Sequence, residues 1–410
     1  MGSQALCRLG IATLLTCFFT ATAGTFAARP DDKKPKRPKF GSSLKRLKWD
    51  EAKRTGVEAP VVEKAGPAVT GDDAIKLETL MVTFDVLVVT REGQQVVTGL
   101  KKEDFAITED GQPQHVAIAT AGDDVTRPRS IVLILDYSAS QGPYLNTSLD
   151  AAKVLINKLG PGDEMAIVTD DVELMSDFTR DKEKLIAVLD KLRKRVFKDD
   201  KVGKSLQFSA LYASLRELLG DKESRPVVIF QGDGDEVTSL RDQPDAADFA
   251  FLRRDARPVE FGLADILAAA EKSRATIYTV VTNDRLIGVP ANQVYQRGVA
   301  LMNKRGYPLD ITDKSYESTV KRYTTIFVEG QKAAARVATL SGGWTAWLEN
   351  PEQAETIYSQ ILSDMNRRYL VGYYPTNTDR DGKQRTVKIE IKGRPEYLVH
   401  GRTKYYAPDQ

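Results

Sequence analysis

The sequence predicts an α/β protein with a doubly wound, mostly parallel, Rossmann-like sheet that is flanked by small N- and C-terminal β units. Short aliphatic runs, typical of strands buried on both faces, occur at 131–135, 165–168 and 226–230. Segments with helical spacing of apolar residues follow them, as at 149–159 and 209–219. This alternation of strand and helix is the pattern of a parallel sheet covered by helices on both faces.

The start of the chain predicts export. A basic residue precedes an apolar run at 9–19, and Ala21-Thr22-Ala23 offers a cleavage signal, so we interpret residues 1–28 as a Sec signal peptide. Both cysteines, Cys7 and Cys17, lie in this leader, which excludes disulfide and thiol chemistry from the mature chain. We therefore expect a secreted or periplasmic bacterial protein.

A change of composition follows the leader. Residues 29–73 are rich in Lys, Arg, Pro and Gly and predict a basic, disordered linker. A solvated linker is the simpler interpretation, and electrostatic contact of the basic segment 33–48 with anionic envelope surfaces is the alternative. Over the whole chain, 59 Lys and Arg face 57 Asp and Glu, a balance that argues against a specific nucleic-acid partner.

Three folded segments are expected after the linker. Residues 74–122 predict a small β domain, in which Asp110-Gly111 makes a hairpin turn. Residues 126–365 predict the α/β domain, with an insertion at 282–330 before a helix resumes at 332–340. Residues 366–410 predict a C-terminal β segment, which could pack on the α/β domain or on the N-terminal β unit.

Polar oxygen atoms collect at the predicted strand ends. Asp136, Ser138 and Ser140 follow the first buried strand, Asp233 follows another, and Ser209 begins a helix. In open α/β sheets, ligands bind at the carboxyl ends of the strands. Hydroxyl and carboxylate oxygens without imidazole or thiolate suit Mg²⁺, or Mn²⁺ or Ca²⁺. Taken singly, the same residues are also ordinary turn and helix-cap residues.

Histidine is too scarce for most catalytic arrangements. The two histidines, His115 and His400, lie in predicted β segments outside the α/β domain. A zinc site or a Ser-His-Asp triad would need a histidine close to its partner residues. We therefore expect no catalytic residues and no enzymatic activity.

The segment Asp136-Tyr137-Ser138-Ala139-Ser140 resembles the Asp-x-Ser-x-Ser signature of von Willebrand factor type A (VWFA) domains. That resemblance implies a metal-ion-dependent adhesion site (MIDAS), with Asp233 supplied by the third loop. It places Ser209 at the second-loop position, where the family prefers Thr. Segments 97–111, 341–343 and 369–375 also resemble secreted VWFA-related proteins of the acidobacterial kind.

The resemblance implies a secreted adhesion or protein-binding module, which uses a divalent ion to bind an acidic side chain of a protein partner. Two alternatives stay open. One is a metal-dependent hydrolase that uses the same ion, with a carboxylate as general base. The other is a structural envelope module whose site is degenerate at Ser209.

Overall fold

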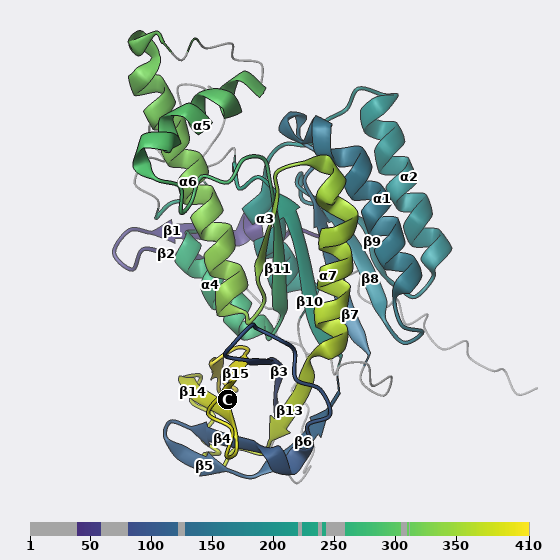
Figure 1. Ribbon diagram of the computed structural model, residues 1–410, viewed down its shortest axis with the longest axis vertical. Coiled ribbons are helices and arrows are strands. Elements are labelled where there is room, and N and C mark those ends of the chain that lie inside the picture. Colours follow the sequence, from purple (N-terminus) through teal and green to yellow (C-terminus); the bar gives the residue numbers. More distant parts are fainter. Residues whose placement is uncertain are drawn as a thin grey trace, which may run out of the picture. The chain divides into compact units, whose positions relative to one another are not determined.

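The central element is a six-stranded sheet of order β12-β11-β10-β7-β8-β9 (Figure 1). The computed structural model describes residues 39–58, 81–121, 128–219, 224–236, 240–242, 259–304, 310 and 312–409. The strands of this sheet are β7 (Arg129–Leu135), β8 (Glu164–Thr169), β9 (Glu173–Thr179), β10 (Arg225–Gly232), β11 (Thr276–Thr282) and β12 (Thr345–Leu348). Neighbouring strands are parallel except β9, which is antiparallel to β8. The predicted doubly wound, mostly parallel sheet is therefore confirmed.

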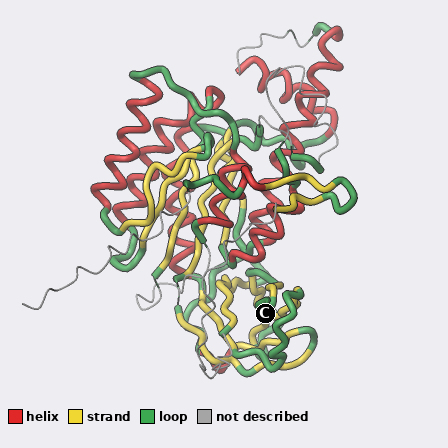
Figure 2. Tube along the Cα trace, turned by 180° about the vertical axis from the view of Figure 1, so that it is seen from behind, coloured by secondary structure: helices red, strands yellow, loops and turns green. Residues whose placement is uncertain are grey.

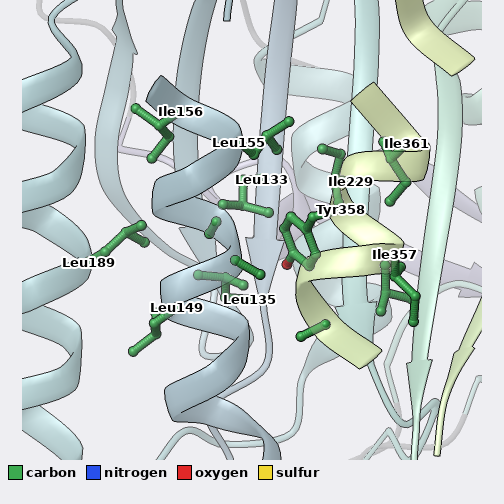
Figure 3. Packing of buried hydrophobic residues seen from close by; sticks show 14 of the residues in the cluster. Leu133, Leu135, Leu149, Leu155, Ile156, Leu189, Ile229, Ile357, Tyr358 and Ile361 are labelled. Carbon is green, nitrogen blue, oxygen red and sulfur yellow. The ribbon is translucent and has the colours of Figure 1, made fainter. Parts of the chain in front are cut away.

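Helices cover both faces of this sheet. They are α1 (Gly142–Lys158), α2 (Lys182–Phe197), α3 (Gln207–Glu217), α4 (Leu263–Ser273), α6 (Glu317–Leu340) and α7 (Ala354–Arg367), whereas α5 (Ala291–Lys304) packs on α6. Successive side chains of β7 point to opposite faces, so Leu133 and Leu135 pack with α1, α2 and α7, as Figure 3 shows. Val132 and Ile134 pack with α3, α4 and α6. None of the helices in the described part of the chain has the length and apolarity that a membrane span requires.

The strand order creates a switch point between β7 and β10. From β7 the chain adds β8 and β9 on one side, and it then returns to add β10, β11 and β12 on the other side. Connections on the two sides of such a point diverge, and open α/β sheets usually bind their ligands there, at the carboxyl ends of the strands. The residues that follow these two strands therefore meet at the usual ligand-binding position of an open α/β sheet.

The first and last β segments form one sandwich. Its strands are β3 (Val82–Thr90), β4 (Phe105–Glu109), β5 (Gln112–Gln114), β6 (Val116–Thr120), β13 (Tyr369–Tyr373), β14 (Gln384–Ile391), β15 (Tyr397–His400) and β16 (Lys404–Tyr406). The two sheets have orders β15-β3-β13-β6 and β16-β14-β4-β5. Figure 2 shows the strands of this sandwich as yellow tubes around the C-terminus. Because β13 lies between β3 and β6, the C-terminal segment packs with the N-terminal β unit, which decides between the two predicted arrangements. The expected hairpin turn has φ of 47° at Asp110 and 83° at Gly111.

Buried ion pairs join the sandwich to the α/β domain. The Arg225 Nε donates to Asp85 Oδ1 of β3 at 2.8 Å. The Arg368 guanidinium, between α7 and β13, pairs through Nε with Asp364 Oδ2 of α7 at 2.8 Å, and its terminal nitrogen donates to the Asp85 carbonyl of β3 at 3.3 Å. Charges buried at such a junction need these partners, since an unpaired one would be strongly unfavourable.

The linker prediction is wrong for residues 39–58. They include an antiparallel hairpin of β1 (Leu47–Asp50) and β2 (Thr55–Glu58), whose Leu47 is buried in the α/β core. Carboxylates of the α/β domain bind the segment through its backbone: Gly41 N donates to Glu217 at 2.9 Å and Trp49 N donates to Glu260 at 2.7 Å. Composition alone missed these partners, which are distant in sequence. The signal peptide and the remainder of the predicted linker lie outside the described residues.

The insertion prediction also needs correction, because α6 begins at Glu317 and not near residue 332. The helix runs without a break across residue 330, so the last part of the predicted insertion and the start of the next element are one helix. Figure 1 shows α5 and the first half of α6 extending beyond the sheet. Two small apolar clusters hold this helical extension, one around Leu301 and Phe327 and the other around Met302 and Val320.

Candidate metal centre at the switch point

Asp136 is the first residue after β7, and it is buried at the switch point. Its backbone N–H donates to the Gln231 carbonyl of β10 at 3.0 Å, which holds the carboxyl end of β7 against β10. One carboxylate oxygen, Oδ1, accepts the Ser138 N–H at 2.9 Å. The other, Oδ2, is buried and has no hydrogen-bond partner among the described residues. Such an acceptor is unfavourable unless a further group satisfies it.

The two serine hydroxyls connect Asp136 to the loop that carries Asp233. Ser138 Oγ and Ser140 Oγ lie 3.2 Å apart, and Ser140 Oγ donates to Asp233 Oδ2 at 2.6 Å. Asp233 follows β10, the strand beside β7. The structure thus brings four of the five predicted ligands together: Asp136, Ser138, Ser140 and Asp233.

Two buried glutamines hold Asp233. Gln207 Nε2 donates to Asp233 Oδ1 at 2.7 Å, and Gln141 Nε2 donates to Oδ2 at 3.0 Å. The Asp235 N–H donates to Oδ1 as well, at 3.0 Å. Gln141 in turn accepts a hydrogen bond at 2.9 Å from the Thr282 hydroxyl at the end of β11. These contacts fix the carboxylate plane of Asp233 relative to three strands of the sheet.

Ser209 has a different neighbour from the one expected. It lies in the first turn of α3, and its hydroxyl donates to Glu236 Oε1 at 2.9 Å, while Phe208 N donates to Glu236 Oε2 at 2.6 Å. Glu236 thereby satisfies donors of the helix N-terminus. The contacts of Ser209 therefore join α3 to the loop after β10, and its role as a metal ligand stays a prediction.

Asp170 is a further buried carboxylate beside the site. It follows β8, and it accepts the Tyr137 N–H at 3.1 Å and the Ser205 N–H at 2.6 Å. Burial raises the pKa of Asp170 to about 6. The pKa of Asp136 is raised well above its usual value, first by burial and then by the negative charges of Asp233 and Asp170.

The sequence analysis missed Asp170, Gln141 and Gln207. A signal existed for Asp170, because only Thr169 separates it from the apolar run 165–168, much as Asp136 follows 131–135. Neither glutamine had a comparable signal. Their importance comes from complete burial next to Asp233, which only the folded chain reveals.

The loop that carries Asp233 packs closely on α6. Gly234 has φ of +76°, and a Cβ added there would lie 2.7 Å from the Gly330 carbonyl carbon of α6. A Cβ on Gly330 would overlap the Gly234 carbonyl in the same way. Two glycines are therefore required where the helical extension meets the site loop.

The donor set fits a divalent cation. Two carboxylates and two hydroxyls converge there, and these are the hard oxygen ligands that Mg²⁺, Mn²⁺ and Ca²⁺ prefer. The unsatisfied Asp136 Oδ2 is the observation that a cation would account for most directly. A cavity of about 720 Å³ elsewhere in the chain, between α3, α4 and the sandwich, is lined by Tyr212, Lys272 and Tyr406 and by none of these ligands.

No family model and no curated protein matches the chain. Among solved structures, it is similar to BatB from Bacteroides thetaiotaomicron, with 15% identity over 58% of this chain and 98% of that chain and a TM-score of 0.32. The vWF domain of the type V pili tip protein Mfa5 from Porphyromonas gingivalis has 12% identity over 58% and 95%, with a TM-score of 0.34. Manganese-loaded TRAP from Plasmodium vivax has 13% identity over 73% and 98%, with a TM-score of 0.28. At these scores the doubly wound fold rests on the strand order and not on the likeness.

Proposed function

We propose that this chain is a non-enzymatic binding protein of the VWFA kind, in which Asp136, Ser138, Ser140 and Asp233 hold a divalent cation. The observation that carries the proposal is the buried Asp136 Oδ2, which has no hydrogen-bond partner among the described residues and lies in a group of hard oxygen atoms. Mg²⁺ is the expected ion, with Mn²⁺ and Ca²⁺ as alternatives.

The residues of the site have different roles in the proposed binding. Asp136 and Asp233 supply negative charge from two adjacent strands, and the serines supply neutral oxygens that leave part of the cation's charge uncancelled. When bound, the cation supplies a positive charge that attracts a carboxylate, so the partner is a protein that offers an acidic side chain. Gln141 and Gln207 orient Asp233, and the Ser138 N–H orients Asp136.

The test is thermal unfolding and calorimetry with Mg²⁺ and Mn²⁺, on the wild type and on Asp136→Ala. A cation at 100 times its Kd should stabilise the wild type by about 2.7 kcal/mol and leave Asp136→Ala unchanged. Asp150→Ala is the matched control, since it removes an exposed acid that pairs with Arg193 on the helix surface. Equal heats from the wild type and Asp136→Ala would rule out the site.

A hydrolase is the second candidate, and the raised pKa of Asp170, about 6, is the observation that favours it. Both oxygens of Asp170 accept backbone N–H groups, however, so the carboxylate is held toward the chain and not toward a substrate. The test is to measure whether the protein hydrolyses generic phosphate and carboxylate esters. Turnover that stops with chelator and with Asp136→Ala would replace the binding proposal by this one.

We also propose that the chain is exported and acts in the bacterial envelope or outside the cell, because its first residues resemble a Sec leader. N-terminal sequencing of the protein from an envelope fraction should begin after residue 23 or 28. A mature protein that retains the leader would contradict export by this route.

A further inference from the structure

The last turn of α2 and the loop that leads to α3 expose two large apolar side chains. We name residues 194–204 the rim segment. Phe197 is 51% exposed and Val202 is 47% exposed, and both belong to the few large hydrophobic residues exposed in the described part of the chain. Exposed apolar groups are unremarkable singly, but two within six residues mark a candidate interaction surface.

The same segment is cationic. It carries four exposed lysines, Lys194, Lys198, Lys201 and Lys204, and none of them forms an ion pair with another described residue. Two exposed acids, Asp199 and Asp200, lie between them. The rim segment therefore carries exposed apolar side chains together with four exposed lysines, a combination that suits a partner with both acidic and apolar side chains.

Backbone hydrogen bonds hold the rim segment against the site. The Gly203 N–H donates at 3.1 Å to the carbonyl of Tyr137, which lies between Asp136 and Ser138 in the sequence. A Cβ on Gly203 would overlap the Asp170 carboxylate, so the loop approaches as closely as a glycine permits. Consecutive Cα atoms are about 3.8 Å apart, which places the backbone of Val202 immediately beside the motif. Val202 therefore lies exposed in a loop that is held beside the motif, and the exposed Phe197 ends the helix from which this loop starts.

Electrostatics connects the rim segment with the metal centre. Three acidic side chains, Asp136, Asp170 and Asp233, lie together at the switch point, and carboxylates there repel those of an acidic partner. Lysines on the adjacent rim offset that repulsion and accelerate encounter with an acidic segment.

We infer that the rim segment is the second half of the binding surface and selects an acidic partner segment in which large apolar residues flank the acid. The inference rests on the proposed metal-dependent binding. One acidic side chain of the partner binds the cation, further acids of the partner contact the lysines, and its apolar residues cover Phe197 and Val202. A protein segment is favoured over an anionic lipid surface, because Asp199 and Asp200 interrupt the lysines and would be repelled by a uniformly anionic surface.

Synthetic peptides test the inference. The probes are a nine-residue peptide with three acidic residues separated by two leucines, and the same peptide with serine in place of leucine. Fluorescence anisotropy in Mg²⁺ should show about tenfold tighter binding of the leucine peptide by the wild type, since two leucine side chains lose contact with water. The double variant Phe197→Ser, Val202→Ser should bind both peptides equally, whereas the control Tyr374→Ser, a 56% exposed aromatic of the sandwich, should keep the preference.

Charge reversal tests the lysines. The triple variant Lys198→Glu, Lys201→Glu, Lys204→Glu should weaken binding of both acidic peptides and reduce its salt dependence. Lys388→Glu, which changes an exposed lysine on β14, should bind as the wild type does.

The outcomes separate this inference from the proposed function. All rim variants should retain the heat of Mg²⁺ binding, because no predicted ligand changes. A wild type that binds Mg²⁺ but does not prefer the leucine peptide would overturn the inference and leave the proposed function standing. If Mg²⁺ binding is absent from the wild type, both fail. Co-sedimentation of the wild type with phosphatidylglycerol vesicles, lost in the rim variants and without a peptide preference, would replace the protein partner by a lipid surface.

Discussion

The carboxylate of Asp136 has one oxygen that Ser138 holds and one that no described group satisfies. Its neighbours on the adjacent strands are carboxylates as well, so burial and repulsion both act against its charge. The fold tolerates this unfavourable arrangement at the position where open α/β sheets bind ligands. At the scale of single residues, the unfavourable placement is therefore the strongest indication of function.

Asp163 is a buried acid whose placement, by contrast, stabilises the fold. Asp163 lies in an ion pair with Arg129, with its Oδ2 at 2.6 Å from the guanidinium. Burial acts to raise the pKa of Asp163, but the hydrogen bonds and charge of Arg129 outweigh burial and hold the pKa below its usual value of 3.8. A lowered pKa contributes stability that is present above the unfolded value and is lost as the pH falls through the folded value.

Asp163→Asn should therefore lower the free energy of unfolding by about 2 kcal/mol at neutral pH, because Arg129 loses its partner. Below the unfolded pKa of 3.8 the difference from the wild type should shrink, since the wild-type carboxyl becomes protonated there as well. Urea unfolding as a function of pH measures both effects. A difference that stays constant into the acid range would show that the pair is not the cause.

Site residues were predictable to different degrees. Asp136, Ser138, Ser140 and Asp233 could be found because each follows a buried strand, and strand ends meet at one edge of a parallel sheet. The neighbour of Ser209 could not be found, because its contact with Glu236 depends on how α3 is rotated relative to the loop after β10. A helix start in a sequence does not define that rotation.

At the scale of elements, the β1–β2 hairpin shows that a basic composition does not exclude order. Leu47 is buried, with 1% of its surface exposed, and the hairpin backbone donates to Glu260 and Asp265 of the α/β domain. The strands of the central sheet were predictable because continuous aliphatic runs are typical of strands that are buried on both faces. The hairpin was not, because its partners are acids that lie about 200 residues away in the chain.

Leu47→Ala should cost about 2–5 kcal/mol of unfolding free energy if the hairpin belongs to the core. Lys48→Ala, which changes the exposed neighbour, should stay within about 0.5 kcal/mol of the wild type. Chemical denaturation of the three proteins measures the difference. Equal stabilities would mean that the hairpin docks without contributing to the fold.

At the scale of the whole molecule, charged groups join the sandwich to the α/β domain. Asp85 of β3 accepts from Arg225 of β10, and the Arg368 terminal nitrogen donates to the Asp85 carbonyl at 3.3 Å. The sequence predicted the α/β domain and the β units that flank it, but not the charged contacts that join them. An isolated Asp in a strand has many available partners, and only the docked sandwich selects one.

Asp85→Asn keeps the shape of the side chain but removes the negative charge that pairs with the buried Arg225. We expect a loss of about 3 kcal/mol of unfolding free energy, and an earlier unfolding of the sandwich than of the α/β domain. Glu390→Gln, which removes an exposed partner of Lys388, should change little. Hydrogen exchange followed by mass spectrometry resolves the two regions, and uniform loss of protection would contradict the expected order.

The contact of Gly330 with Gly234 couples the position of α6 to the loop that carries Asp233. The first half of α6 projects beyond the sheet (Figure 1), and Gly330 in its second half touches the backbone of Gly234, next to Asp233. No side chain lies between the two backbones at this contact, so a displacement of α6 reaches the site loop directly. We therefore expect a load on the N-terminal half of α6 to change first how firmly Asp233 is held, and through Asp233 the proposed binding of a cation at the switch point.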